Sequence, residues 1–362
     1  MTAPPATATL LLTAFAIPLI AAVVFKLFWT TPSRWRTFAQ SLSLSLITCL
    51  IVLLALELYF RQFVIASDNL GFIRTSQAWF HKYYHPINSF GYRDIEHPES
   101  SLEGKRVLYV VGDSLMAGQG IDDYRDRLSN ILQERLGDEW AVINIAKSGW
   151  TTEQEFKGVR TYPHRADEIL WEYYPNDIEP AAIRHGYMKP TASGDVAFLQ
   201  GESSSITAQA FRDPRLSWII NESYAFNYFY WKLFQITDDT SAHYLEALHK
   251  SFQRRVTWEE HTSALDEMIS FSRSNNIGLT VVVFPFLQDL EGSARMTSKV
   301  VDFFDSRGVA TLDLTPVLAG RNPDELTVSR ADTHPNPKVH REVADLLGPY
   351  VERLRAQAAK RL

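Results

Sequence analysis

The chain has 362 residues, of which 46% are hydrophobic and 22% are charged, and its formal net charge is −6. This length allows one large domain or two ordinary ones, with an ample core. The mildly acidic balance, without any block of lysine or arginine, argues against nucleic acid as a partner. A single cysteine, Cys49, rules out an intrachain disulfide and a cysteine-rich metal site.

Two apolar runs near the N-terminus have the length of membrane-spanning helices. No charged side chain occurs from residue 2 to 25 or from residue 37 to 56, and about 20 apolar residues cross a bilayer as a helix. Residues 1–60 are therefore predicted to form a two-helix transmembrane anchor. A cleaved signal peptide explains the first run less well, because no basic residue precedes it and a second run follows. Two buried helices of a soluble protein are the other alternative.

The basic residues around these runs predict the orientation of the anchor. Lys26, Arg34 and Arg36 lie in or beside the short connection, whereas the N-terminal tail has no basic side chain. By the positive-inside rule the connection is cytoplasmic, and the large C-terminal part lies outside the cytoplasm. Arg61, just after the second run, weakens this contrast. The sequence thus predicts a two-pass protein of the inner or plasma membrane.

Residues 61–104 are interpreted as a connector, after which strands and helices alternate. Short apolar runs rich in β-branched or large residues are typical of buried strands. Such runs occur at 106–111, 141–146, 168–174, 279–285 and 309–314.

Helical patterns separate most of these runs. Apolar residues recur at helical spacing in 123–136, 257–274 and 338–355, and Gly137 suits a helix C-cap. Thr152 followed by Glu155 has the spacing of a capping box. Strands that alternate with helices predict an α/β fold in which both faces of a parallel sheet are covered.

One segment, 178–256, is longer than a crossover between strands needs. It is loop-like at 190–215 and aromatic at 224–231. Insertions at the edge of a parallel sheet often form a lid or a wall of the substrate site. The aromatic residues are equally compatible with packing onto the core or the membrane surface, so both interpretations stay open.

Four short polar segments follow the predicted strands, at the edge where parallel sheets bind ligands. Each alone is compatible with an ordinary turn. Together they offer a serine, an imidazole to remove its proton and a carboxylate to orient that imidazole, as nucleophilic acyl transfer requires. The segments are Gly112-Asp113-Ser114, Ser148-Gly149, Asn176-Asp177, and Asp332 with His334.

This ordered set resembles the SGNH, or GDSL, hydrolase family over about residues 105–355. The resemblance implies a three-layer α/β/α, flavodoxin-like domain at 105–358 with a mainly five-stranded parallel sheet. It also implies that Ser114 is the nucleophile, His334 the general base and then acid, and Asp332 the residue that orients His334. The oxyanion donors would be the backbone N–H groups of Ser114 and Gly149 and the side-chain amide of Asn176.

The sequence departs from the family pattern at two places. Tyr174 occupies the position where the family usually has glycine, and Asp332 precedes His334 by two residues rather than three. Asp324 is the fallback for the acidic member. Alginate O-acetyltransferase relatives also use an Asp-x-His pair, although there it precedes the serine, which keeps transfer to a sugar hydroxyl open.

A metal-dependent site is the other chemical alternative. His81 and His85 are four residues apart, as in helical metal pairs. No matching carboxylate motif accompanies them, and Pro86 ends any helix there. No phosphate-binding glycine loop or dinucleotide fingerprint is present either. We therefore expect no metal and no cofactor.

Three functions remain compatible with the sequence. The first is a membrane-anchored serine esterase that hydrolyses acyl esters, foremost O-acetyl esters, of an envelope or extracellular glycan or lipid. The second is O-acyl transfer to a cell-surface polysaccharide by the same triad. The third is a non-catalytic scaffold of a surface-assembly machine. The acyl group, the alcohol portion, the oligomeric state and any protein partners stay open.

Overall fold

The computed structural model describes residues 23, 26, 33–69, 71, 73–188, 209–211, 213–237 and 240–359. The chain divides into two compact units. The first comprises Met1–Val64 and Ser223–Ala225, and the second comprises Ile65–Glu222 and Phe226–Leu362.

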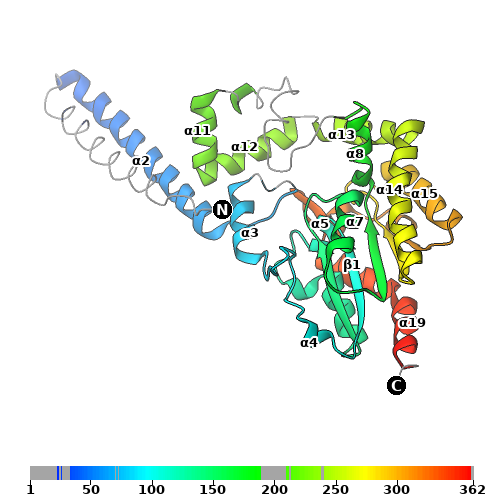
Figure 1. The fold of residues 1–362 in the computed structure, drawn as a ribbon. Coiled ribbons are helices and arrows are strands. Elements are labelled where there is room, and N and C mark those ends of the chain that lie inside the picture. Colours follow the sequence, from blue (N-terminus) through cyan, green and yellow to red (C-terminus); the bar gives the residue numbers. More distant parts are fainter. Residues whose placement is uncertain are drawn as a thin grey trace. The chain divides into compact units, whose positions relative to one another are not determined.

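The first unit contains one helix that is long and apolar enough to span a membrane. Helix α2 (Ser33–Phe63) includes the 24-residue stretch Gln40–Phe63, within which a window of 18 residues has a mean hydropathy of 2.3 (Figure 1). The other predicted span, 2–25, lies outside the described residues except for residue 23. The described part of the chain therefore contains one candidate span, and the two-span anchor is not confirmed.

Helix α2 continues beyond the predicted end at residue 56 and binds residues 223–225, which belong to the same unit. The carboxylate of Glu57 accepts hydrogen bonds from the Ser223 hydroxyl at 2.7 Å and from the N–H groups of Tyr224 and Ala225. These groups begin helix α12 (Tyr224–Thr237). A carboxylate stabilises a helix N-terminus because the first N–H groups have no partners within the helix.

The second unit is built around a five-stranded sheet in which every neighbouring pair is parallel. The strand order is β2-β1-β3-β4-β5. All five predicted strands are present, with ends that differ by two residues or fewer from the predicted ends. The strands are β1 (Arg106–Gly112), β2 (Trp140–Ala146), β3 (Glu168–Tyr173), β4 (Gly278–Val283) and β5 (Ala310–Asp313).

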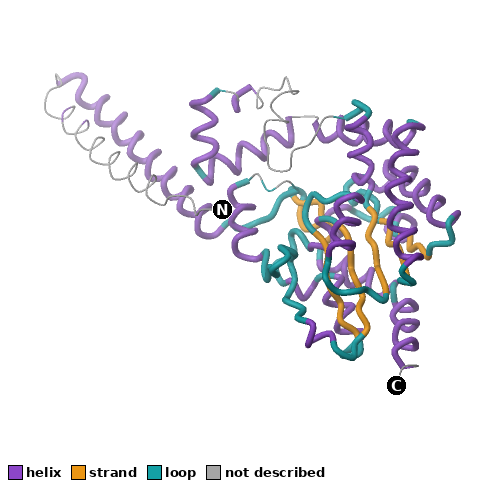
Figure 2. Tube along the Cα trace, viewed as in Figure 1, coloured by secondary structure: helices purple, strands orange, loops and turns teal. Residues whose placement is uncertain are grey.

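Helices cover both faces of this sheet, as Figure 2 shows. Alternate residues of β1 enter two different cores, because successive side chains of a strand point to opposite faces. Tyr109 and Val111 pack with helices α7 (Thr152–Thr161), α14 (Arg255–Ser274) and α15 (Leu290–Ser306). Val110, which lies between them, packs on the other face. The second unit is thus a three-layer α/β/α fold, as predicted.

The opposite core joins Leu108 and Val110 to the other helical layer. That layer contains α6 (Leu128–Leu136), α18 (Pro337–Leu346) and α19 (Gly348–Ala359). The remaining elements lie between these strands and helices in the chain. They are α3 (Arg74–Tyr83), α4 (Glu99–Leu102), α5 (Ser114–Ala117), η1 (Tyr124–Asp126), η2 (Pro175–Ile178), α8 (Glu179–Arg184), α11 (Pro214–Glu222), α13 (Thr240–Gln253), α16 (Thr315–Leu318), α17 (Pro323–Leu326), β6 (Thr327–Ser329) and β7 (Asp332–Pro335).

The capping box of α7 lies one residue before the predicted one. Thr151 is the N-cap, with extended backbone angles, and Gln154 accepts from its N–H at 2.9 Å. Glu155 is instead fully buried and accepts a hydrogen bond from the Trp171 indole N–H at 2.7 Å. The prediction of Thr152 and Glu155 was wrong because burial of Glu155 takes precedence over local capping.

The predicted connector is packed onto the second unit from Ile65 onward. The side chain of Arg93 is buried and donates to four backbone carbonyl groups. Two of its acceptors are Tyr83 O at 2.6 Å and Ile121 O at 2.7 Å. A buried guanidinium with several acceptors fixes the segments around it, because leaving its donors without partners is costly.

The insertion at 178–256 is mainly helical where the structure describes it. Its predicted loop at 190–215 lies outside the described residues except for 209–211 and 213–215. In the aromatic part, Trp231 and Phe234 are buried in a small cluster with Phe211 and Ile220. Packing therefore accounts for these two rings, whereas Phe226 and Phe229 are exposed. Helix α13 packs against α8, α14 and η2, so part of the insertion borders the segment that contains Asn176.

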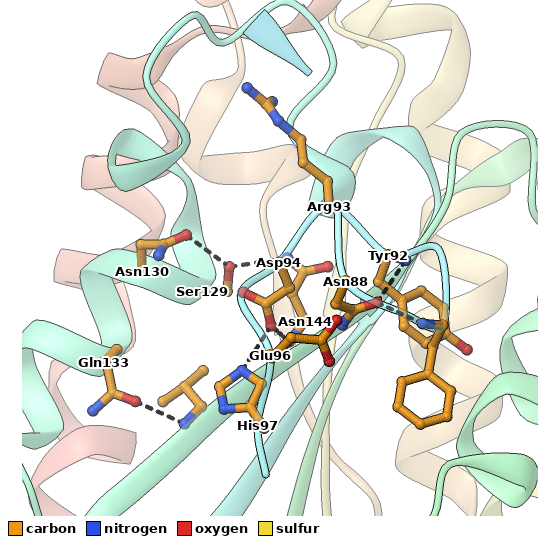
Figure 3. Close-up of polar contacts among 12 residues, drawn as sticks. Asn88, Tyr92, Arg93, Asp94, Glu96, His97, Ser129, Asn130, Gln133 and Asn144 are labelled. Atoms are coloured by element: carbon orange, nitrogen blue, oxygen red, sulfur yellow. Dashed lines mark hydrogen bonds and ion pairs between the residues drawn. The ribbon is translucent and has the colours of Figure 1, made fainter. Parts of the chain in front are cut away.

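Strand β2 forms one edge of the sheet, and side chains bind its outward backbone groups. Gln133 Oε1 accepts from the N–H of Val142 at 2.8 Å, and Asp94 Oδ2 accepts from the N–H of Asn144 at 2.8 Å (Figure 3). His97 Nε2 lies 3.1 Å from the same Asp94 oxygen. These contacts satisfy groups that an open edge would leave exposed.

Candidate active site

Ser114, His334 and Asp332 form one hydrogen-bonded chain of buried side chains. Ser114 Oγ lies 2.8 Å from His334 Nε2, and His334 Nδ1 lies 2.5 Å from Asp332 Oδ1. With its proton on Nδ1, the imidazole donates to the carboxylate and accepts from the serine hydroxyl. This order of contacts can activate a serine hydroxyl as a nucleophile.

The short spacing between the acid and the histidine is accommodated by the hairpin of β6 and β7. Asp332 Oδ1 accepts from the backbone N–H of His334 at 3.2 Å as well as from its ring. The carboxylate therefore turns back along its own strand, and two residues are enough. The fallback residue is elsewhere, since Asp324 forms an exposed ion pair with Arg330 at 2.6 Å.

Asp332 and His334 stabilise each other's charged forms. Burial favours the neutral carboxyl, but the charge and hydrogen bonds of His334 hold the pKa of Asp332 below its usual value. Burial also opposes protonation of His334, yet Asp332, followed by Asp113 and Asp68, raises the pKa of the imidazole. An imidazole with a raised pKa is a stronger base toward the Ser114 proton.

The serine is presented by a tight junction between β1 and α5. Asp113 is the N-cap of α5, and its Oδ1 accepts from the N–H of Leu115 at 2.8 Å. Gly112 is required before it, because a Cβ there would overlap Glu172 and Met116. Ser114 therefore stands at the first position of a helix, directly beyond the carboxyl end of β1.

The predicted oxyanion donors lie on neighbouring segments at this edge of the sheet. Gly149 follows β2, which pairs with β1, and its φ of 78° is in the region that favours glycine. Asn176 is in η2, after β3, and its Nδ2 donates to Asp113 Oδ2 at 3.4 Å. An amide nitrogen carries two hydrogens, so one remains for a ligand. The structure thus brings Asn176 next to the nucleophile loop.

Buried acids support these loops, and the sequence pattern assigned none of them a catalytic role. Asp177 Oδ1 accepts from the N–H of Thr152 at 2.9 Å, which ties η2 to the start of α7. Glu172 Oε2 accepts from the N–H of Asp113 at 3.1 Å. Burial raises the pKa of Glu172 well above its usual value, and Asp113 adds to the rise. The signal in the sequence was Glu172, a charged residue near the end of the mainly apolar run 168–174.

Tyr174, which occupies the family's glycine position, lies two residues before Asn176 in the chain, and its ring is packed. Its ring contacts Phe286 edge-on, with 4.8 Å between ring centroids, and packs against both hydrophobic cores. The departure therefore adds an aromatic wall at the start of η2 rather than a flexible turn.

The histidine pair that suggested a metal is arranged differently. His85 Nε2 lies 2.9 Å from the carbonyl oxygen of His81. In the part of the chain that the structure describes, no three side chains of His, Cys, Asp or Glu gather as a metal site would require.

No protein-family model and no curated protein matches the sequence. Solved structures with a similar course of the chain include TesA, at 15% identity and a TM-score of 0.40, covering 69% of this chain and 99% of that one. A carbohydrate acetylesterase family member from Sinorhizobium meliloti is 17% identical, with a TM-score of 0.35 and the same coverage of 69% and 99%. A lipase/acylhydrolase from Enterococcus faecalis is 13% identical, with a TM-score of 0.39 and coverage of 70% and 96%. At such identities the chemistry of this chain rests on its own site residues.

Proposed function

We propose that this protein is a membrane-anchored serine esterase that forms an acyl-enzyme on Ser114. The observation that carries the proposal is the buried chain from Ser114 Oγ to His334 Nε2, at 2.8 Å, and from His334 Nδ1 to Asp332 Oδ1, at 2.5 Å. Each contact has the donor and acceptor that general-base activation of a serine needs.

In the first step Ser114 Oγ attacks the carbonyl carbon of an ester while His334 Nε2 takes the hydroxyl proton. Asp332 stabilises the imidazolium that forms. The carbonyl oxygen becomes an anion, which the N–H groups of Ser114 and Gly149 and the amide of Asn176 would bind. The intermediate then collapses, the imidazolium gives its proton to the leaving alcohol oxygen, and the acyl group stays on Ser114.

In the second step a water molecule replaces the alcohol. His334 removes a proton from the water, whose oxygen attacks the acyl carbon, and the proton then returns to Ser114 Oγ as the carboxylic acid leaves. If a sugar hydroxyl took the place of water, the same steps would transfer the acyl group.

The proposed substrate is an O-acetyl ester of an envelope or extracellular glycan or lipid. Two features support it. The backbone and side-chain groups at Ser114, Gly149 and Asn176 offer donors for the carbonyl oxygen of an ester. The apolar stretch Gln40–Phe63 and the basic residues that precede it favour an enzyme held at a membrane with its site outside the cytoplasm.

A fluorophosphonate probe tests the nucleophile directly, because it labels an activated serine without any knowledge of the substrate. We expect labelling of the full-length protein, no labelling of Ser114→Ala and strongly reduced labelling of His334→Ala. Ser101→Ala, which changes an exposed serine whose hydroxyl donates to Pro98 O, is the matched control and should label like the parent. Labelling that persists in Ser114→Ala would reject this serine as the nucleophile.

Acetate release separates hydrolysis from transfer. The purified protein is incubated with an acetyl ester donor, with and without a glycan acceptor, and acetate and acetylated glycan are both quantified. Hydrolysis predicts acetate release that the acceptor does not suppress. Acetylated glycan that forms faster than acetate would instead assign the protein as an O-acyltransferase.

A further inference from the structure

Residues 67–69, which we call the clamp segment, begin four residues after the end of α2 and have no regular secondary structure. We infer that the clamp segment is part of the catalytic machinery and positions Asp332 and His334 against Ser114. The inference rests on the proposed function, and it gives the chain directly after the anchor helix a role beyond that of a tether.

One side of the clamp segment binds the strand that contains the acid and the base. The N–H of Asn69 donates to Ala331 O at 3.1 Å. Asn69 Oδ1 accepts from the N–H of Thr333 at 2.6 Å and from its hydroxyl at 3.1 Å. Thr333 stands between the two triad members Asp332 and His334, so these three bonds fix the backbone from which both side chains extend.

The other side of the clamp segment binds the loop that follows the nucleophile. Gln119 Nε2 donates to Asp68 O at 2.8 Å and to Asn69 O at 3.3 Å. The N–H of the same glutamine donates to Ser114 O at 3.0 Å. The clamp segment thus joins the two halves of the triad, which are 220 residues apart in the chain.

Ser67 approaches the outer oxygen of the triad carboxylate. Ser67 Oγ and Asp332 Oδ2 are both buried, and neither has a partner at hydrogen-bonding distance among the described residues. A Cβ built on Gly120 would lie 2.8 Å from Asp332 Oδ2 and 3.1 Å from Ser67 Oγ, so both atoms border one point. A buried donor and a buried acceptor that border one point complement each other, since leaving either unbonded costs free energy. The hydroxyl of Ser67 also helps to hold the pKa of Asp332 low.

The clamp segment is held in place by its own residues. The carboxylate of Asp68 accepts from the N–H groups of Gly71 and Ile73, the latter at 2.9 Å. The N–H of Asp68 donates to Ser76 Oγ at 3.2 Å, in helix α3. These contacts fold the segment against the start of α3 before any ligand binds, which is what a positioning element requires.

A pH test of the clamp segment must account for the charged and titratable groups that shift the pKa of His334. They are Asp332, Asp113, Asp68 and His340. Ser67 and Asn69 carry no charge, so replacing either by alanine leaves all four groups in place. A change in the titration of His334 then reports an altered His334–Asp332 pair, through its geometry or through the hydroxyl of Ser67, and not the loss of a charge.

The experiment measures the rate of fluorophosphonate labelling of the full-length protein as a function of pH. For Ser67→Ala and Asn69→Ala we expect the rate at neutral pH to fall about 10- to 100-fold, as for a misplaced catalytic pair. We also expect the acid limb to move to lower pH, because a looser contact with Asp332 lowers the pKa of His334. The midpoint of this limb does not depend on how much protein is folded, so lost stability alone would leave it unchanged.

Two further variants sharpen the result. Asn69→Asp keeps an acceptor oxygen for Thr333 and should recover most of the rate lost in Asn69→Ala. Ser101→Ala alters an exposed serine outside the clamp segment and should match the parent in rate and in midpoint. If Ser67→Ala and Asn69→Ala label like the parent at every pH, the clamp inference is wrong while the proposed function stands. If the parent itself does not label, the proposed function fails first.

Discussion

At the scale of single residues, Asp332 holds His334 by two hydrogen bonds to one carboxylate oxygen. The bond to Nδ1 fixes the tautomer that leaves Nε2 free to accept from Ser114, and the bond to the backbone prevents the carboxylate from turning away. The acid therefore controls both the protonation and the orientation of the base.

The raised pKa of His334 predicts the pH dependence of ester hydrolysis. The base must be neutral, so kcat/KM should fall as the pH drops through the pKa of His334, and this acid limb should lie above the pKa of an ordinary histidine. Asp332→Asn removes the charge that raises this pKa. We expect the limb to move to lower pH and the rate to fall about 10⁴-fold. A limb that stays in place would show that Asp332 does not act on the base.

Removal of the Asn176 amide tests its proposed role as an oxyanion donor. Asn176→Ala should lower kcat by about 10²- to 10³-fold with a much smaller change in KM, because the oxyanion exists only in the transition state and intermediate. Steady-state kinetics on a small acetyl ester would measure both constants. Asn275→Ala, at the C-terminal end of α14 and in contact with Phe271 O, is the control and should leave kcat unchanged. A variant of Asn176 with raised KM and parental kcat would assign it to ground-state binding.

Some of these residues could be identified from the sequence, and others could not. Ser114 and Asn176 follow apolar strands directly, so local pattern was sufficient to place them at one edge of the sheet. Glu172 is a charged residue in a mainly apolar strand, so its importance could have been noticed from the sequence, but no role was predicted for it. Ser67 and Asn69 have no such signal, because the triad strand that they approach lies more than 250 residues away in the chain.

At the scale of elements, buried acids connect β3, η2 and α7 beneath the site. Glu172, Glu155 and Asp177 all have raised pKa values, first because they are buried and then because they lie near other acids. A carboxyl whose pKa is raised by folding contributes stability at low pH, and this contribution is lost as the pH rises toward its folded pKa. These loops are therefore expected to be more firmly held in mildly acidic solution.

Glu172→Gln tests this consequence. Glutamine resembles the protonated acid and can still accept from the N–H of Asp113, but it has no proton to lose. The melting temperature of the variant should match that of the parent near pH 4 and exceed it increasingly toward about pH 8. Thermal unfolding measured across this range gives the difference directly.

An exposed acid provides the comparison for this stability test. Glu103→Gln, in the loop before β1, should show no such pH-dependent gain, because Glu103 is exposed. A constant difference between Glu172→Gln and the parent at every pH would mean that Glu172 is ionised in the folded protein.

The five strands were predictable because strands buried on both faces form continuous apolar runs. The ends of the helices were less predictable than the strands. A single helix was predicted at 338–355 because one periodic apolar face continues through it. The structure has two helices there, which meet at Leu347 and Gly348. The predicted helix at 123–136 begins at Leu128, because Asp123 caps a short 3-10 turn first.

At the scale of the whole molecule, the proposed anchor predicts on which side of the membrane the site is located. Alkaline phosphatase, which is active only outside the cytoplasm, should be active when fused after residue 362 and inactive when fused after Arg34, in the connection between the predicted spans. The full-length chain should also stay with the membrane during alkaline extraction. An inactive C-terminal fusion that is produced in full would place the site in the cytoplasm and remove extracytoplasmic glycans from consideration.

The side chains that bind the edge of β2 have a consequence for neighbouring copies of the protein. Molecules confined to one membrane share an orientation and meet far more often than they would in free solution. The unpaired N–H and C=O groups of an open strand edge could then bond to the sheet of an adjacent copy and form aggregates. Gln133 and Asp94 occupy the bonding positions that a foreign strand would need at Val142 and Asn144 (Figure 3). If the protein is held in a membrane as proposed, it can therefore be crowded there without its sheets fusing along this border.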